Sequence, residues 1–312
     1  MQRDLTITII IGLKMKHFKD AILNSDFNQK GFTKFRLLNT SQIECLKAFY
    51  YEEVNEKQRL LTKGGFHTTS NTGDNSLLKK VDAFNKSILI PELNKFLTNV
   101  TFTLSNFLVK ESTLDSAVPP HQDWLLVDES QFTSFNIWIC LDEANAQSGE
   151  MKFIPGSHLL SKSHRANGKP RFFDGFVQKL EPLFEYVPTA PGDCVIFHHS
   201  IIHGSTTNKS GKKRLSCVLG GYSSSADFLF YLPDLQDDNL LRKFQIQPET
   251  MLNMGPNYEP QVNILSQEKL KGKFETWTFN EFIFQLKKKY PPIKLSLANK
   301  LSLLFYSSKK TL

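Results

Sequence analysis

The stretch from Pro191 to Arg214 restricts most strongly how this chain can fold. Pro191-Gly192 is typical of a type II turn, because proline fixes φ at the first central position and glycine permits positive φ at the second. A short apolar run from Cys194 to Phe197 follows, as expected of a buried strand. The run leads to His203 in a His-Gly-Ser sequence, and Arg214 comes eleven residues later. The stretch therefore predicts consecutive β-strands that begin at a tight turn.

A second stretch, Pro119 to Trp124, supplies matching chemistry. His121 and Asp123 stand two residues apart in it, so on a strand both side chains leave the same face. One histidine and one carboxylate on a strand, with a second histidine from a distant strand, are the ligand set of a non-heme Fe(II) oxygenase. Such a set occupies one face of an octahedron and leaves open positions for a bidentate 2-oxo acid and for O2.

The order of the motifs resembles that of the phytanoyl-CoA dioxygenase family of Fe(II)/2-oxoglutarate-dependent oxygenases. The resemblance runs from about Phe27 to Tyr222. The matching elements are His121-Gln122-Asp123, Gly149 with Pro155-Gly156-Ser157-His158, Pro191-Gly192-Asp193, His203-Gly204-Ser205 and Arg214. A lone His-X-Asp arises often by chance, whereas the ordered set is specific. The resemblance implies that His121, Asp123 and His203 bind Fe(II), with 2-oxoglutarate and O2 as co-substrates.

Arg214 is the predicted anchor of 2-oxoglutarate. Its planar guanidinium is a two-pronged donor that matches a carboxylate, which lysine cannot reproduce. On the strand after His203 it can face the same cavity, and Lys110 or Lys213 would be the cation to replace it if this assignment failed. The resemblance implies that Ser205 and Trp138 also line the co-substrate site, although an aromatic residue in an apolar strand is more often part of the core.

Neighbouring histidines compete with His203 as the second imidazole ligand. His199 and His203 would be four residues apart on one face if this segment were a helix. The preceding apolar run favours a strand, and the family pattern places the ligand in His-Gly-Ser, so His203 is preferred. His158 is expected to be a structural or lid residue.

The carboxylate at Asp123 bears on the type of reaction. By resemblance, related halogenases have a small residue at this position and leave the coordination site to chloride. Asp123 therefore favours hydroxylation or a related oxidation. The substrate itself is not encoded in the motifs, because variable loops build the substrate pocket.

The first part of the chain predicts helices. Ser41 to Glu44 has the pattern of a capping box. A second helix is expected from Leu77 up to Pro91, because apolar residues recur there at helical spacing. Gly31 to Leu38 is expected to be an edge strand, and residues 62–76, rich in Gly, Thr, Ser and Asn, a mobile loop.

From Val100 onward the apolar period changes to two. Helices followed by many strands argue for a mainly β protein with flanking helices, a double-stranded β-helix of the cupin-like jelly-roll kind. Strands are predicted at Phe132–Leu141, Met151–Ile154, Phe184–Val187, Cys194–His198 and Arg214–Gly220. The predicted division is a disordered or mis-annotated extension at 1–14, a helical flank at 15–99, the catalytic core at 100–225 and a C-terminal extension at 226–312. The basic segment from Leu159 to Leu180 is expected to be a lid or substrate loop, with a disordered loop as the alternative.

Composition restricts the location of the protein. The four cysteines form no Cys-X-X-Cys pair, and most lie in apolar runs where cysteine acts as a small buried hydrophobe. Leu5 to Leu13 is apolar but too short to span a bilayer, and it lacks the cleavage site of a signal peptide. A reduced, cytoplasmic protein is the simplest interpretation. The net charge of +7 is moderate and does not by itself indicate a nucleic-acid partner.

The end of the chain is basic. Residues 282–312 contain seven lysines and no acidic residue, and Leu297, Leu301, Leu304 and Phe305 fall at helical spacing. A basic amphipathic helix can make a weak contact with an anionic membrane surface. The commoner arrangement, a helix that packs its apolar face on the barrel and leaves its lysines in solvent, is preferred.

The leading function is therefore an Fe(II)/2-oxoglutarate-dependent dioxygenase that oxidises a small molecule and releases succinate and CO2. The alternatives are a non-catalytic cupin-like binding module, a hydroxylase acting on protein or nucleic acid, and a zinc hydrolase. An intact ligand set together with Arg214 speaks against the binding module. A nucleic-acid substrate would call for a dense basic and aromatic groove near the ligands, and the sequence gives no sign of one. Oxygen consumption linked to 2-oxoglutarate would separate these classes.

Overall fold

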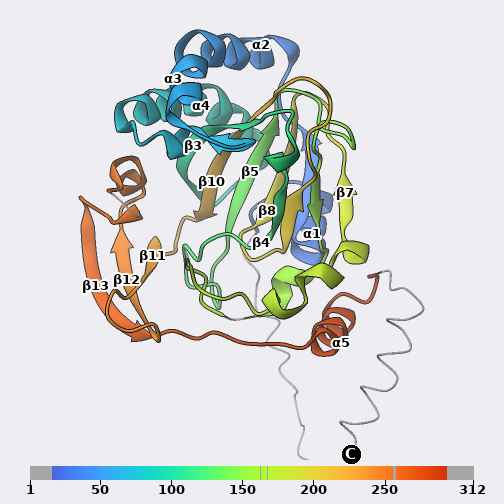
Figure 1. The fold of residues 1–312 in the computed structure, drawn as a ribbon, viewed down its shortest axis with the longest axis vertical. Coiled ribbons are helices and arrows are strands. Elements are labelled where there is room, and N and C mark those ends of the chain that lie inside the picture. The colour runs from blue at the N-terminus through green and yellow to red at the C-terminus, as the bar shows by residue number, and fades with distance from the viewer. Residues whose placement is uncertain (1–15, 162, 167, 256–257, 294–312) are drawn as a thin grey trace, which may run out of the picture.

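The computed structural model describes residues 16–161, 163–166, 168–255 and 258–293, and at its centre lie β-sheets flanked by helices (Figure 1). The predictions for the extension at 1–14 and for the helical spacing at 297–305 lie outside the described residues. Among the described residues, no helix combines the length and the apolar content needed to cross a bilayer.

Two antiparallel sheets form the barrel, which confirms the mainly β, jelly-roll prediction. The larger sheet has six strands in the order β1-β8-β5-β10-β3-β2, and the smaller has four in the order β4-β9-β6-β7. The larger comprises β1 (Phe32–Arg36), β8 (Asp193–His198), β5 (Ser134–Cys140), β10 (Arg214–Ser223), β3 (Val100–Lys110) and β2 (Phe66–Thr68). The smaller comprises β4 (Val118–His121), β9 (His203–Ser205), β6 (Met151–Phe153) and β7 (Glu185–Val187).

Alternation along the strands of the larger sheet separates two cores, because successive side chains point to opposite faces. Phe135 and Ile137 of β5 pack in one cluster with apolar residues of the N-terminal helices. Trp138 packs in another cluster with Phe153 and Val187 of the smaller sheet. The second cluster therefore fills the space between the sheets, and polar residues on the same inner face are held inside the barrel.

The N-terminal helices cover the outer face of the larger sheet (Figure 1). They are α1 (Ala21–Lys30), α2 (Thr40–Phe49), a π-helical segment (Tyr50–Val54), α3 (Asn55–Leu61) and α4 (Asn75–Phe96). Short 3-10 helices occur at Thr69–Thr72, Leu114–Ser116, Ser157–Leu159, Asp174–Lys179, Glu181–Leu183 and Pro248–Asn253.

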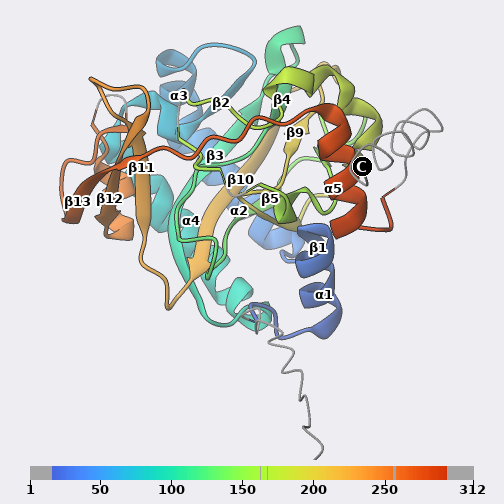
Figure 2. The ribbon, with the colours of Figure 1, turned by 90° about the horizontal axis from the view of Figure 1, so that it is seen from below.

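The residues after β10 form a small sheet and a last helix. β11 (Leu229–Pro233), β12 (Leu240–Ile246) and β13 (Ile264–Lys271) pair in that order at one side of the barrel. The chain then crosses the molecule to α5 (Phe279–Lys289) on the other side, as Figure 1 and Figure 2 both show.

Three local predictions for the N-terminal part need correction. The capping box of α2 is formed by Asn39 and Gln42, so the predicted box at Ser41–Glu44 is wrong by two residues. Residues 62–76 include β2 and a 3-10 helix instead of forming a loop throughout. α4 continues through Pro91, because full burial of Leu89 and Leu93 on either side offsets the roughly 3 kcal/mol that an interior proline costs. The edge position of β1 is as predicted.

The described part of the basic segment at 159–180 is anchored by aromatic side chains. Phe172, Phe173 and Phe176 are buried and pack in one cluster with Phe282 and Leu286 of α5. The prediction of a lid or disordered loop for this segment did not anticipate these anchors, because α5, far along the chain, supplies the rest of the cluster. The segment is consequently tied to the C-terminal helix at the rim of the barrel.

Candidate metal centre

The pairing of β4 with β9 brings together the two histidines that the sequence singled out. The strands are antiparallel, with His121 directly opposite His203, and the imidazole centroids lie 4.2 Å apart. Asp123 follows β4, and its Oδ1 and Oδ2 lie 3.6 Å from Nε2 of His121 and 3.6 Å from Nε2 of His203, respectively. One ligand atom from each residue lies within 4.8 Å of the others, and no other such group occurs among the described residues.

Backbone carbonyls fix which imidazole nitrogen is available to a metal. Nδ1 of His121 donates to the carbonyl of Pro119 at 2.9 Å, and Nδ1 of His203 donates to the carbonyl of Ile201 at 3.1 Å. A carbonyl can only accept, so Nδ1 carries the proton and Nε2 keeps its lone pair. Both Nε2 atoms face the Asp123 carboxylate, which is the tautomer and orientation that a metal ligand needs.

Further side chains hold Asp123 in place. Nδ2 of Asn136, on β5, donates to Oδ2 of Asp123 at 2.9 Å. Nε of Arg165 donates to the Asp123 carbonyl at 2.7 Å, and the same guanidinium forms a two-pronged ion pair with Glu129. Sequence reasoning missed both residues. The available signal for Asn136 was an asparagine between Phe135 and Ile137 in a predicted strand, whereas no sequence signal pointed to Arg165.

The charge states suit a divalent cation. Burial, followed by the neighbouring His121, lowers the pKa of His203 to about 4. Burial opposes ionisation of Asp123, but His203, His121 and its other neighbours outweigh it and hold the pKa of that carboxyl below its usual range. Near pH 7 the site therefore presents a neutral imidazole at His203 and an ionised carboxylate, and two imidazole nitrogens with one carboxylate match non-heme iron.

The structure places His203, and not His199, with the other two ligands. His199 is buried, with its Nδ1 2.9 Å from the hydroxyl oxygen of Ser134. His158 stacks on His198, and its Nε2 lies 3.2 Å from the carbonyl of Asn28. His158 thus joins α1 to the barrel, in keeping with the structural role expected of it.

Arg214 begins β10 and lies inside the barrel with 3% of its surface exposed. Its guanidinium donates to the carbonyl of Gly149 and lies 5.3 Å from the Trp138 ring centroid, while Nε has no hydrogen-bond partner. Burial lowers its pKa to about 10, so it remains charged near pH 7. A buried cation with an unused donor fits a carboxylate ligand.

Lys110 is a second buried cation beside Arg214. The two residues are directly paired between β3 and β10, and Lys110 is fully buried. Its Nζ donates to the carbonyls of Ser116 and Thr206. Burial, and then the neighbouring Arg214, lower its pKa to about 7. Among the described residues, no carboxylate forms an ion pair with either cation.

The other two residues assigned by resemblance also lie inside the barrel. Ser205 is two residues after His203 on β9, so the two side chains leave the same face, and it is buried. Trp138 packs between the sheets and beneath the Arg214 guanidinium. Their contact with a co-substrate stays a prediction.

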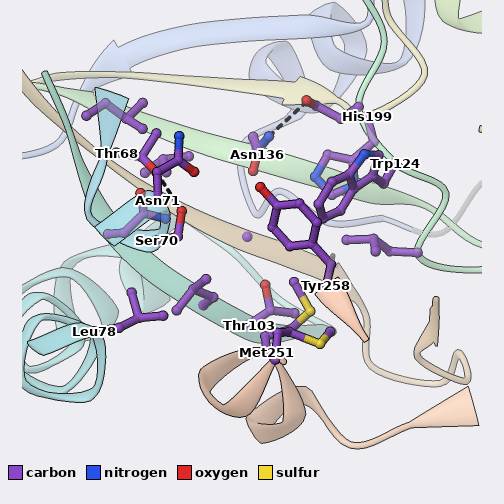
Figure 3. A pocket seen from close by; sticks show the side chains of 18 of the residues that line it. Thr68, Ser70, Asn71, Leu78, Thr103, Trp124, Asn136, His199, Met251 and Tyr258 are labelled. Atoms are coloured by element: carbon purple, nitrogen blue, oxygen red, sulfur yellow. Dashed lines mark hydrogen bonds between the residues drawn. The ribbon is translucent and has the colours of Figure 1, made fainter. Parts of the chain in front are cut away.

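A cavity of about 990 Å³ opens at the candidate ligands. His121, Asp123, Asn136 and His199 are among its lining residues, and Figure 3 shows Asn136 and His199 close together. Arg214, Ser205 and Trp138 are not among the lining residues. Arg214 lies deeper in the barrel, because its guanidinium is folded against Gly149 and Trp138.

A smaller cavity of about 520 Å³ borders His121 from the side of the segment at 163–174. Arg165, Lys169 and Arg171 line it. Each of these cations already has an acidic partner, respectively Glu129, Asp238 and Asp174. Its positive charge is therefore largely compensated within the chain.

Comparison with known proteins agrees with the sequence motifs. Residues 27–216, more than half of the chain, match the family model described as phytanoyl-CoA dioxygenase (PhyH). This match confirms the resemblance that the sequence predicts over about the same range.

Curated relatives align over a shorter part. A phytanoyl-CoA dioxygenase domain-containing protein 1 homolog of Caenorhabditis elegans is 30% identical over 122 residues, 35% of this chain and 42% of that protein. The phytanoyl-CoA dioxygenase domain-containing protein 1 of Bos taurus is 30% identical over 118 residues, 35% of this chain and 40% of that protein. The chain thus aligns with about two fifths of the length of these relatives.

Among solved structures, the fold resembles that of the non-heme alpha ketoglutarate dependent carbocyclase SnoK from nogalamycin biosynthesis. The TM-score is 0.50 at 20% sequence identity, and the match covers 70% of this chain and 88% of that one. At this identity the likeness concerns the fold alone.

Proposed function

Because the chain belongs to the phytanoyl-CoA dioxygenase family, we propose that it is an Fe(II)/2-oxoglutarate-dependent dioxygenase that oxidises a small molecule. One observation carries the proposal: the barrel holds both a ligand group of two imidazoles and one carboxylate and, separately, a buried guanidinium that has no acidic partner within the described part of the chain. A non-catalytic binding module has no need of both features.

His121, Asp123 and His203 would hold the iron. Iron, when bound, supplies the activation of O2, with 2-oxoglutarate giving succinate and CO2. The residues around the ligands act by position: the carbonyls of Pro119 and Ile201 orient the imidazoles, and Asn136 restrains the carboxylate. A ligand group held in this way needs little rearrangement to bind a cation.

Arg214 would hold the distal carboxylate of 2-oxoglutarate, with Lys110 as a second positive charge nearby. Each hydrogen bond to a charged group contributes about 1.5–3 kcal/mol. The unused Nε of Arg214 is available for such a bond, and the Trp138 ring beneath the guanidinium restricts its orientation. The deep position of Arg214 would keep the distal carboxylate of 2-oxoglutarate away from the large cavity, most of which would remain for the primary substrate.

Asp123 bears on the outcome of the reaction. A carboxylate among the ligands leaves no coordination position to a halide, which favours hydroxylation or a related oxidation of the substrate. The substrate would occupy the large cavity, whose wall includes Trp124 beside the ligand group. Enclosure by that wall would exclude water from the reacting centre.

The test is oxygen uptake and succinate formation by protein reconstituted anaerobically with Fe(II). We expect slow uptake that requires both Fe(II) and 2-oxoglutarate, with succinate formed in step with oxygen consumed. The His203→Ala variant should lose both signals. Succinate formation that continues unchanged in His203→Ala, or hydrolysis supported by zinc in place of iron, would show that the site has another function.

Two further expectations remain predictions. A cytoplasmic location is one of them. The other is a weak contact with anionic membranes through the basic end of the chain, of which the described part contributes Lys287–Lys289 at the end of α5.

A further inference from the structure

Polar side chains gather at two separate places in the large cavity. Figure 3 shows Thr68, Ser70 and Asn71 together at one place, and Asn136, His199 and Trp124 together at the other. The second place is the one that holds the candidate iron ligands.

The described lining contains no lysine, arginine or glutamate, and its one aspartate is the candidate ligand Asp123. A charged group is costly to remove from water unless an opposite charge receives it. Arg165 and Arg171 line the smaller cavity and are paired with Glu129 and Asp174. The cavity is consequently suited to an uncharged molecule.

The same lining offers many uncharged hydrogen-bonding groups. They are Thr68, Ser70, Asn71, Thr103, Asn106 and Asn136. Asn106 on β3 is the informative one, because it is 7% exposed and its Oδ1 has no hydrogen-bond partner. Asn136, by contrast, is bonded to Asp123. A pure hydrocarbon would leave Asn106 unsatisfied, whereas a hydroxyl or an amide N–H of a ligand would donate to it.

One wall of the cavity comes from a part of the chain outside the family match. Met251, Met254 and Tyr258 line it, and the Tyr258 ring meets Trp124 edge-on at 4.9 Å. Figure 3 shows Met251 and Tyr258 between the two groups of polar side chains. Thioether and aromatic side chains adapt to irregular apolar surfaces. Since residues 27–216 match the family, this wall is where the chain departs from the shared core.

We propose that this cavity binds an uncharged amphipathic substrate, which directs hydroxyl or amide donors toward Asn106 and an apolar surface toward Met251, Met254 and Tyr258. The inference rests on the proposed function for the reaction that follows binding, but the binding itself can be measured separately. It assigns the choice of substrate to the segment after β12.

Three alkyl glycosides with one apolar chain test the proposal by titration calorimetry below their micellar concentrations. Octyl glucoside is uncharged and carries donors, octyl glucuronide differs by one carboxylate, and permethylated octyl glucoside keeps the ring but has no donor. We expect octyl glucoside to bind at least tenfold more tightly than either of the others. Equal or tighter binding of the glucuronide or of the permethylated probe overturns the proposal, as does the absence of measurable octyl glucoside binding.

Two variants locate the binding. Asn106→Leu should weaken octyl glucoside about tenfold and remove its advantage over the permethylated probe. Met251→Lys, which adds a cation to the wall, should reverse the preference in favour of the glucuronide. Preferences unchanged from wild type in a folded Met251→Lys protein would place the probes elsewhere and overturn the assignment.

Arg214→Ala separates this inference from the proposed function. Arg214 does not line the cavity, so this variant should bind octyl glucoside as wild type does while losing 2-oxoglutarate turnover. Wild-type protein that binds octyl glucoside but consumes no oxygen with 2-oxoglutarate would refute the proposed function and leave the binding site standing. Turnover of 2-oxoglutarate without the expected order of probe affinities would refute the proposed substrate class and leave the proposed function standing.

Discussion

Two polar regions lie inside the same barrel, and they differ in whether the chain supplies partners for their charged groups. At the candidate metal centre, opposite charges and hydrogen-bond partners meet: the Asp123 carboxylate faces His121 and His203 and accepts from Asn136. At the cation pair, Lys110 and Arg214 lie side by side, and the donors for which a partner is found reach only backbone carbonyls. The described chain supplies opposite charges at the metal centre, whereas it supplies no opposite charge at the cation pair.

The difference separates what each region contributes to folding and to binding. Two buried like charges that have no counter-charge among the described residues lower the stability of the fold. Burial, and then the neighbouring Arg214, accordingly lower the pKa of Lys110 to about 7. A bound dicarboxylate would supply the missing charge. The metal centre is therefore expected to keep its shape without ligand, whereas the cation pair is expected to gain most from one.

The largest expected effect concerns the metal centre. His203→Ala should abolish iron binding and turnover, because only two of the three protein ligands remain. Iron stoichiometry by elemental analysis measures it, with His199→Ala as the matched control that keeps its iron. Loss of iron in His199→Ala with retention in His203→Ala would show that the ligands are assigned to the wrong histidine.

Next in size is the effect of Arg214 on the co-substrate. Arg214→Lys keeps the charge but loses the two-pronged geometry, so the Michaelis constant for 2-oxoglutarate should rise roughly ten- to a hundredfold, about 1.4 kcal/mol for each factor of ten. Arg214→Ala should raise it further. Iron content should be unchanged in both variants, because arginine does not bind a cation. A wild-type Michaelis constant for 2-oxoglutarate in Arg214→Ala would show that another cation binds the co-substrate, and Lys110 would be the first to test.

Lys110 should give the protein a pH-dependent stability. Its pKa of about 7 in the folded state lies below the ordinary value of 10.5, so between these values the unfolded chain holds a proton that the folded chain lacks. The free energy of unfolding should therefore rise with pH across that window, by up to about 1.4 kcal/mol per unit from this group. Below about pH 7 both states are charged and this contribution to the slope vanishes.

Urea unfolding of wild type and Lys110→Met between pH 7 and 10 measures the slope. The difference between the two proteins should rise with pH, and the exposed Lys212→Met should follow wild type. Parallel curves for wild type and Lys110→Met would mean that Lys110 keeps its proton in the fold, and hence that the cation pair is compensated by a group not yet identified.

The smallest expected effect is that of the ring beneath Arg214. Trp138→Phe retains an aromatic face but a weaker one, and a cation–π contact contributes roughly 0.5–1 kcal/mol. The Michaelis constant for 2-oxoglutarate should then rise about two- to fivefold, with iron content unchanged. A loss of iron in Trp138→Phe would instead show that the two regions are coupled through the barrel core.

The motifs alone predicted much of the core and of its ligand group. Pro191-Gly192 predicted the turn before β8, and Gly192 has φ +92° as such a turn requires. A Cβ at Gly192 would lie 2.6 Å from the Leu38 carbonyl oxygen, so only glycine fits there. The ligand group of His121, Asp123 and His203 agrees with the prediction, but Asp123 lies just after β4 and His199 lies in the turn after β8, so the chain that leaves each strand, and not alternation along one strand, sets their positions.

The tertiary structure alone decided which polar groups have partners. Lys110 and Arg214 lie far apart in the sequence, and only the pairing of β3 with β10 brings them together. Whether Oδ1 of Asn106 finds a hydrogen-bond partner depends on everything packed around it. The wall formed by Met251 and Tyr258 comes from a region without a motif. Sequence patterns report local geometry and periodicity, whereas burial without a partner is a property of the whole packed interior, so no local pattern could have predicted it.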